Sequence, residues 1–140
     1  MAPVAARIRK PTITLGRTDH DKLTRLAETV QAGNAEVVDV LFSELDRAGI
    51  VPDARLAEDV IRMGSHVRYA TETGEVREVT LVYPGRADIS AGRISILTPI
   101  GAALIGLSSG QSMDWRARDG RVHRLVVQSV GVSEPGGQGQ

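Results

Sequence analysis

Residues 93–110 read Arg-Ile-Ser-Ile-Leu-Thr-Pro-Ile-Gly-Ala-Ala-Leu-Ile-Gly-Leu-Ser-Ser-Gly, and they decide the fold. Ile94 and Ile96 alternate with Ser95, which is the period-2 pattern of a half-buried strand. After the strand the stretch carries no charge as far as its end. It therefore predicts a strand that leads directly into one short, apolar helix.

This helix has a recognisable beginning and end. Thr98 offers a side-chain oxygen for an N-cap, and Pro99 suits the first helical position, where its missing N–H costs nothing. Gly106 can adopt the left-handed conformation that ends a helix. Because a helix that is apolar all round must be covered on most sides, we expect it to be the buried plug of a small sheet domain.

The composition is that of a globular protein with one core. Of 140 residues, 41% are hydrophobic, and 17 basic residues balance 17 acidic ones. The zero net charge removes the electrostatic basis for non-specific nucleic-acid binding. The absence of cysteine excludes disulfides and thiolate metal sites. The sequence shows neither a secretory signal nor the roughly 18 consecutive apolar residues of a membrane span, so we expect a cytoplasmic protein.

Two amphipathic helices are predicted ahead of the sheet. Residues 18–21 have the Thr-x-x-Asp form of a capping box, and apolar residues follow at helical spacing over residues 23–30 and again over 37–45. Two helices joined by a few residues must lie antiparallel, so residues 18–48 predict a helical hairpin, a short coiled coil. With roughly 13–15 residues in each helix, the hairpin is about 20 Å long.

The rest of the chain is predicted to form strands around the apolar helix. Turn signals at Thr73-Gly74, Pro84-Gly85 and Asp119-Gly120 separate runs with strand-like alternation. The predicted fold class is α+β, with an N-terminal antiparallel helical hairpin followed by an antiparallel β-sheet domain with one inserted helix. The predicted division is a flexible tail (1–11), the hairpin (12–49), a connector (50–63), the sheet domain (64–131) and a disordered tail (132–140).

Motifs for catalysis or cofactor binding are weak in this sequence. Residues 101–108 have the Gly-x4-Gly spacing of a phosphate-binding loop, but Leu107 stands where the lysine is needed. His20, His66 and His123 are scattered without metal-ligand spacing, which indicates structural or surface roles. The sequence predicts no catalytic residue, no metal site and no cofactor, and hence a protein that is not an enzyme.

Glu36 and Asp39 are the only paired carboxylates that we single out. They stand one helical turn apart near the predicted tip of the hairpin, where two carboxylates on one face can hold a divalent ion or act as acid and base. The alternative, which we favour, is that Glu36 complements the N-terminus of its helix and Asp39 is a solvated surface residue.

Several segments, taken in order, resemble a known family. Residues 63–69, 74–84 and 96–107 are similar to the regulator of nucleoside diphosphate kinase (Rnk) family, which shares its C-terminal domain with the Gre transcript-cleavage factors. Residues 98–106 match the Gre-type signature of this domain. Further matches to the Rnk pattern occur at residues 10–14 and 44–47, so the similarity spans about residues 10–130.

The resemblance implies an FKBP-like sheet domain and a hairpin that together bind bacterial RNA polymerase at its secondary channel. In Gre factors a long coiled coil carries paired acidic residues to the polymerase active site, where they help to hold a catalytic magnesium. A hairpin of about 20 Å is roughly half that length. Glu36 and Asp39 echo the acidic tip but do not reach the active site, so we expect docking without stimulation of transcript cleavage.

The resemblance also implies where docking occurs. In Gre-like proteins the sheet domain contacts polymerase near the turn that starts the helix, which corresponds here to Thr98, Pro99 and Ile100. A role for these residues as cap and buried plug alone stays open. The expected partner is RNA polymerase, with no specific nucleic-acid sequence and no membrane.

Alternative functions stay open beside transcription regulation that affects nucleoside diphosphate kinase levels. One is direct contact with nucleoside diphosphate kinase. Another is FKBP-like prolyl isomerisation, which is disfavoured because the predicted sheet domain has only three aromatic residues, Tyr69, Tyr83 and Trp115. A monomer is favoured, although any exposed part of the stripe over residues 37–45 offers a surface for pairing two chains.

Overall fold

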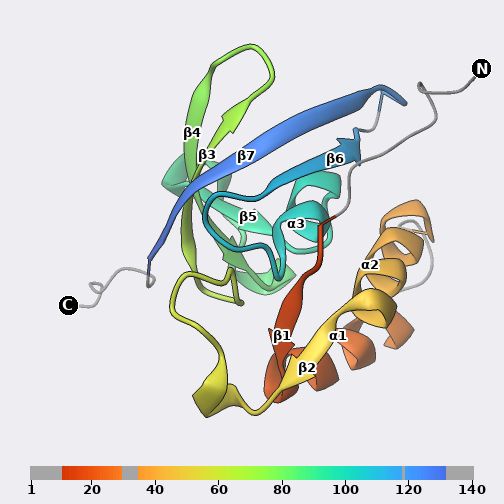
Figure 1. Cartoon of the computed structure of the whole chain (residues 1–140). Helices are drawn as coiled ribbons and strands as arrows, with labels where there is room; N and C mark the ends of the chain where they lie inside the picture. The colour runs from red at the N-terminus through yellow and green to blue at the C-terminus, as the bar shows by residue number, and fades with distance from the viewer. Residues whose placement is uncertain (1–10, 30–34, 118, 132–140) are drawn as a thin grey trace, which may run out of the picture.

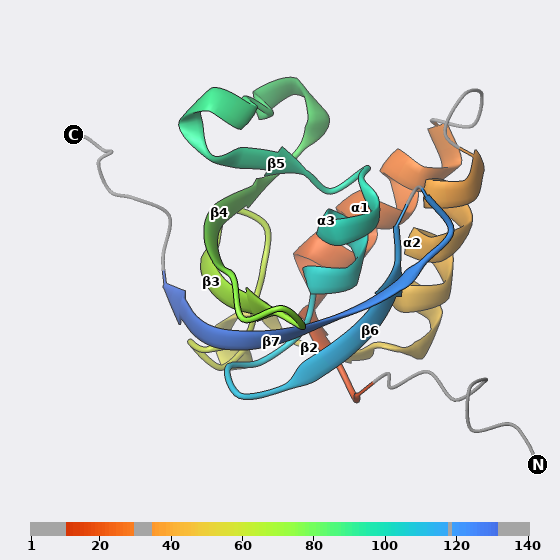
Figure 2. The same ribbon diagram turned by 90° about the horizontal axis from the view of Figure 1, so that it is seen from above.

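The computed structural model describes residues 11–29, 35–117 and 119–131, so the predicted tail at 132–140 and all but Pro11 of the predicted tail at 1–11 lie outside it. Helices α1 (Arg17–Thr29) and α2 (Ala35–Arg47) lie side by side on one flank, and helix α3 (Pro99–Leu104) lies between them and a sheet (Figure 1). The sheet contains β3 (His66–Thr71), β4 (Val76–Val82), β5 (Arg93–Ser95), β6 (Ser112–Arg116) and β7 (Val122–Gly131). Figure 2 shows this sheet curling around α3.

The sheet is mixed, which corrects the prediction of an antiparallel one. Its strand order is β5-β4-β3-β7-β6, and the neighbours are antiparallel except for β4 and β5, which are parallel. The cause is the connection between them. Residues 83–92 form two short 3-10 turns, Pro84–Arg86 and Ile89–Ala91, instead of a tight hairpin turn. Strand β5 therefore runs in the same direction as β4.

A second, smaller sheet was not predicted. Strand β1 (Thr14–Gly16) pairs in parallel with β2 (Gly49–Val51), so it joins the segment before α1 to the segment after α2. Each strand has three residues, too few for a period of two to be recognised in the sequence. The two strands tie together the ends of the segment that contains both helices.

The two N-terminal helices have the predicted extent, with 13 residues each. Their apolar stripes are covered, since Leu23, Ala27, Val37, Leu41 and Leu45 are all buried. The stripe over residues 37–45 therefore leaves little apolar surface for pairing two chains, although Val40 is partly exposed.

The start of α1 differs from the predicted capping box. The helix begins at Arg17, and the N–H of Thr18 donates to Oδ1 of Asp53 at 3.0 Å. Asp53 belongs to the 3-10 turn Asp53–Arg55, which follows β2. The acceptor for the helix N-terminus thus comes from a distant segment, which no local sequence pattern reveals.

The buried plug at α3 is confirmed. Ala102, Ala103 and Leu104 are at most 2% exposed, and Ala103 and Leu104 belong to one apolar cluster with residues from α1, α2 and the sheet. Gly106 has φ +83°, the left-handed conformation predicted at the end of the helix. Because one cluster joins the helices to the sheet, the division of the chain at residues 49 and 64 stays a prediction.

Strand β7 contains a local irregularity near Leu125-Val126-Val127, where three consecutive apolar residues interrupt the alternation of apolar and polar side chains. Its pairing with β3 passes from Arg68↔Ser129 to Tyr69↔Val127, so Gln128 is the extra residue of a bulge. The strand is covered on one face here, because Val126 is 40% exposed while its neighbours Leu125 and Val127 are buried.

Candidate functional site

The turn that starts α3 is fixed by a local network of hydrogen bonds. The hydroxyl of Thr98 donates to the carbonyl of Ser95 at 2.7 Å and accepts from the N–H of Gly101 at 3.1 Å. The hydroxyl of Ser95 accepts from the N–H of Leu97 at 2.9 Å. These bonds confirm Thr98 as the N-cap and Pro99 as the first helical residue.

Gly101 allows this turn to close tightly. A Cβ at this position would clash with the carbonyl oxygen of Ser95 and would lie 3.0 Å from both Cα of Ile96 and Oγ1 of Thr98. The backbone of α3 therefore packs directly on the end of β5.

The three predicted docking residues lie together at the exposed end of α3. Thr98, Pro99 and Ile100 are half-buried, whereas the next four residues of the helix are buried. Ile100 also packs against the core. The position suits a surface that a partner contacts and equally suits a cap and plug, so exposure alone does not distinguish the two roles.

The acidic pair lies on a different element. Glu36 and Asp39 are both exposed on the first turns of α2. Within the described ranges, no group of three or more acidic or histidine side chains lies close enough together to hold a metal ion. Glu36 lies in the first turn of α2, where a carboxylate favours the helix N-terminus, and the roles of Glu36 and Asp39 stay predictions.

The near-match to a phosphate-binding loop has a structural role. Residues 101–104 complete α3, and Leu107 is fully buried. The N–H of Ile61 donates to the carbonyl of Leu107 at 2.7 Å, and the N–H of Gly106 donates to the carbonyl of Ile61 at 2.9 Å. The backbone N–H of Gly106, which would have to face a phosphate in a phosphate-binding loop, thus bonds to the preceding connector.

The three histidines also have structural partners. His20 hydrogen-bonds with the carbonyl of Leu45 at 3.1 Å and so links α1 to the end of α2. His66 hydrogen-bonds with Thr80 and Glu78 on β4. His123 hydrogen-bonds with Glu72 at 2.7 Å and packs its ring against that of Trp115. Their positions fit the predicted structural and surface roles.

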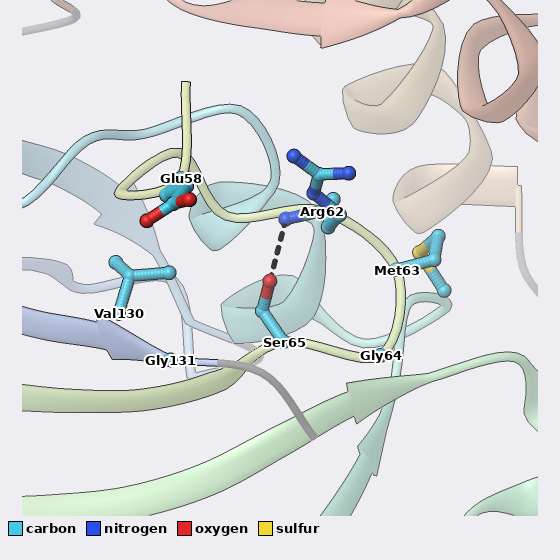
Figure 3. A pocket seen from close by; sticks show the side chains of 7 residues that line it. All are labelled: Glu58, Arg62, Met63, Gly64, Ser65, Val130 and Gly131. Atoms are coloured by element: carbon cyan, nitrogen blue, oxygen red, sulfur yellow. Dashed lines mark hydrogen bonds between the residues drawn. The ribbon is translucent and has the colours of Figure 1, made fainter. Parts of the chain in front are cut away.

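A surface pocket of about 720 Å³ lies where the connector meets the end of β7 (Figure 3). Its walls include Arg62, Met63, Ser65 and Val130. Two of the polar groups that line it bond to the protein, since the hydroxyl of Ser65 accepts from the N–H of Arg62 at 2.9 Å and the guanidinium of Arg62 donates to the carbonyl of Leu56. Glu58 adds an exposed carboxylate to the lining.

A buried charged pair was missed by sequence reasoning. Glu44 is fully buried in α2 and pairs with Arg47, whose Nη2 lies 2.7 Å from Oε1 of Glu44. Nη1 of Arg47 also donates to the carbonyl of Pro11 and so fixes the segment that leads into β1. The signal was present as a Glu and an Arg three residues apart beside the apolar stripe.

Two titratable groups lie close together where α1 meets the sheet. Burial raises the pKa of Asp19, although the hydrogen bond from the N–H of Met63 opposes the shift. Burial also raises the pKa of Tyr83 to about 12, and the negative charge of Asp19 adds to this effect. Both shifts follow from packing between elements, and neither group lies at the start of α3.

Family models match both halves of the chain. A model described as Rnk N-terminus matches residues 11–51, and a model described as transcription elongation factor, GreA/GreB, C-term matches residues 56–131. The regulator of nucleoside diphosphate kinase of Escherichia coli strain K12 is 35% identical over 119 residues, which are 84% of this chain and 88% of that protein. The chain belongs to the Rnk family.

The chain is also similar to transcription elongation factors. The transcription elongation factor GreA of Rhodospirillum rubrum is 33% identical over 108 residues, which are 73% of this chain and 69% of that protein. A solved structure of a prokaryotic transcription elongation factor GreA/GreB from Nitrosomonas europaea is 36% identical, with a TM-score of 0.68 over 87% of this chain and 99% of that chain. The fold is therefore GreA/GreB-like.

The family matches divide the site residues between the two segments. Glu36 and Asp39 lie in the Rnk N-terminal segment, which ends at Val51, the last residue of β2. Thr98, Pro99 and Ile100 lie in the GreA/GreB segment. Among the described helices of this Rnk-family chain, none is long and apolar enough to cross a bilayer.

Proposed function

We propose that the chain is a non-catalytic transcription regulator that binds bacterial RNA polymerase at the secondary channel. The observation that carries the proposal is the presence, in one chain, of an Rnk N-terminal segment and a GreA/GreB C-terminal segment. Docking through an FKBP-like sheet domain uses the start of α3, where Thr98, Pro99 and Ile100 form a rigid, half-exposed surface.

The proposal includes docking without stimulation of transcript cleavage. Helices α1 and α2 have 13 residues each, and a short antiparallel hairpin of this length reaches about 20 Å. Glu36 and Asp39 are exposed but lack a third ligand among the described residues. The regulator acts in the cytoplasm as a monomer, by occupying the channel that longer factors use, and so changes nucleoside diphosphate kinase levels.

The test is binding of the purified chain to core RNA polymerase from the same kind of bacterium. We expect co-elution in gel filtration, displacement by a GreA protein, and no increase in transcript cleavage by stalled complexes. The variant Pro99→Glu should weaken binding while the protein stays folded, because a carboxylate is tolerated at a helix N-terminus. The double variant Glu36→Gln/Asp39→Asn is the matched control and should bind normally. Absence of binding at micromolar concentration contradicts the proposal.

A second candidate is direct contact with nucleoside diphosphate kinase, which is favoured by the name of the Escherichia coli relative, regulator of nucleoside diphosphate kinase. Kinase activity measured with and without the added chain separates the two proposals. A change in the activity of purified kinase supports direct contact. An effect seen only in transcription supports the polymerase proposal.

A further inference from the structure

Ile89 is far more exposed than any other large apolar side chain that the structure describes. It is 83% exposed, whereas the other exposed large hydrophobic residues lie between 39% and 46%. Those residues, such as Val76 and Val122, stand on strands or on α2, where part of each side chain still covers the protein. Ile89 stands on the connection between β4 and β5, in which every residue from Pro84 to Ala91 is exposed.

The loop that carries Ile89 is held in place by its own hydrogen bonds. The carboxylate of Asp88 accepts from the N–H of Ser90 at 3.1 Å and from its hydroxyl at 2.7 Å. The backbones of Asp88 and Arg93 exchange two hydrogen bonds of 2.9 Å, and Nε of Arg93 donates to the carbonyl of Arg86 at 2.9 Å. Because the backbone is fixed, Ile89 is held away from the core. Such preorganisation lowers the entropic cost of binding a partner.

The loop lies at one end of β5 and the start of α3 lies at the other. Strand β5 is an edge strand, and Thr98 lies only six positions after Gly92, at most about 20 Å of extended chain. Figure 2 shows the loop and the turn into α3 along the same edge of the sheet. An interface of ordinary size, about 800 Å² on each partner, covers both features at once.

The charges around Ile89 indicate what kind of surface it fits. Asp88 is neutralised by Arg93, whose Nη2 lies 3.6 Å from Oδ2 of Asp88. Arg86 is exposed, and its guanidinium makes no ion pair or hydrogen bond within the described part of the chain. The loop thus offers one apolar side chain beside one free positive charge. A complementary surface has a small apolar pocket with a carboxylate at its rim.

We infer that Ile89 is a second anchor for the protein partner that contacts the start of α3, inserting into an apolar pocket with an acidic rim on RNA polymerase. The inference rests on the proposed function, because it takes the polymerase as that partner. It adds a contact on a separate loop, outside the turn at Thr98, and a role for Arg86 in pairing with the acidic rim. Inserting the exposed side chain of Ile89 into an apolar pocket removes its apolar surface from water, so loss of this side chain weakens binding.

The test is equilibrium binding of the full chain to core RNA polymerase with matched variants. Ile89→Asn should raise Kd at least about tenfold, while Ile89→Val should bind nearly as well as the original chain. Val76→Asn is the control, because Val76 is 43% exposed at the opposite end of β4 from the loop, and its Kd should stay within about twofold. Arg86→Glu should weaken binding most at low salt. All four variants should keep the thermal midpoint of the original chain, since these side chains lie outside the core.

The outcomes separate this inference from the proposed function. If the original chain binds and Ile89→Asn binds equally well, the second anchor is wrong and the polymerase proposal stands. An equal loss for Ile89→Asn and Val76→Asn also overturns the inference, because the effect is then not specific to the loop. If the original chain does not bind polymerase, the proposed function and this inference both fail.

Discussion

Asp19 on α1 accepts a hydrogen bond at 3.1 Å from the backbone N–H of Met63, 44 residues further along the chain. The N–H of Thr18, the next residue toward the N-terminus, donates to Asp53 in the same connector. The first turn of α1 is therefore attached to the segment that leads into the sheet. These two carboxylates fix how the helix pair sits against the rest of the molecule.

Asp19→Ala removes this attachment. The N–H of Met63 loses its acceptor, and we expect the free energy of unfolding to fall by about 1–2 kcal/mol. Asp19→Asn is the matched control, because its side-chain oxygen still accepts the hydrogen bond. Urea unfolding at neutral pH measures both. Equal stability of the alanine variant and the original chain contradicts the assigned role.

The raised pKa of Asp19 predicts a particular pH dependence. The folded state holds this proton more tightly than the unfolded state, so the contribution of Asp19 to stability falls as the pH rises from 3.8, the ordinary aspartate value, through the raised value. Asp19→Asn lacks this proton. The stability of the variant relative to the original chain should therefore increase over this range, and a decrease in urea-unfolding experiments contradicts the prediction.

Gly101→Ala tests the close packing of α3 on β5. A Cβ would meet the carbonyl of Ser95 and Cα of Ile96, both of which belong to the backbone and cannot rotate away. We expect a loss of about 2 kcal/mol or more. Gly85→Ala is the control, since a Cβ there meets nothing within 4 Å and should leave the thermal midpoint nearly unchanged.

Thr98→Ala removes the N-cap of α3. The N–H of Gly101 and the carbonyl of Ser95 both lose a partner, and we expect a cost of about 1–2 kcal/mol. Thr98→Ser keeps the hydroxyl and should recover most of the stability in thermal unfolding. A serine variant as unstable as the alanine variant means that the methyl group, not the cap, is what matters.

Arg47→Met tests the buried charged pair. The variant takes the cation away from the buried Glu44 and the donor from the carbonyl of Pro11, so we expect a loss of about 2–4 kcal/mol. The double variant Arg47→Met/Glu44→Gln should lose less than the sum of the two single changes, by about 1 kcal/mol or more. Strict additivity in urea unfolding shows that the two residues do not act together.

The parts of the fold that were predicted correctly depend on short-range chemistry. The cap at Thr98, the proline at the first helical position and the left-handed Gly106 each follow from two or three neighbouring residues. The extents of α1 and α2 follow from apolar periodicity over several turns. Such features survive folding because tertiary contacts reinforce the local preference.

The parts that were missed depend on residues distant in sequence. Asp53 caps a helix 35 positions earlier, and β1 pairs with a strand that follows both helices. The parallel pairing of β4 and β5 is decided by the loop between them, whose exposed Ile89 has no local pattern that distinguishes it from a strand residue. The place of Thr98 and Pro99 at the start of α3 was predicted correctly, and a docking role for them and for Ile100 stays a proposal.

The pairing of β1 with β2 has a consequence for how this chain can change. Gly16 lies opposite Val51, and the whole of α1 and α2 falls between these two residues. The segment that contains both helices thus begins and ends at a single pair of hydrogen-bonded strands. Residues added between α1 and α2 leave the pairing of Gly16 with Val51 in place. The length of the helices can therefore increase without moving the point at which the chain leaves β2.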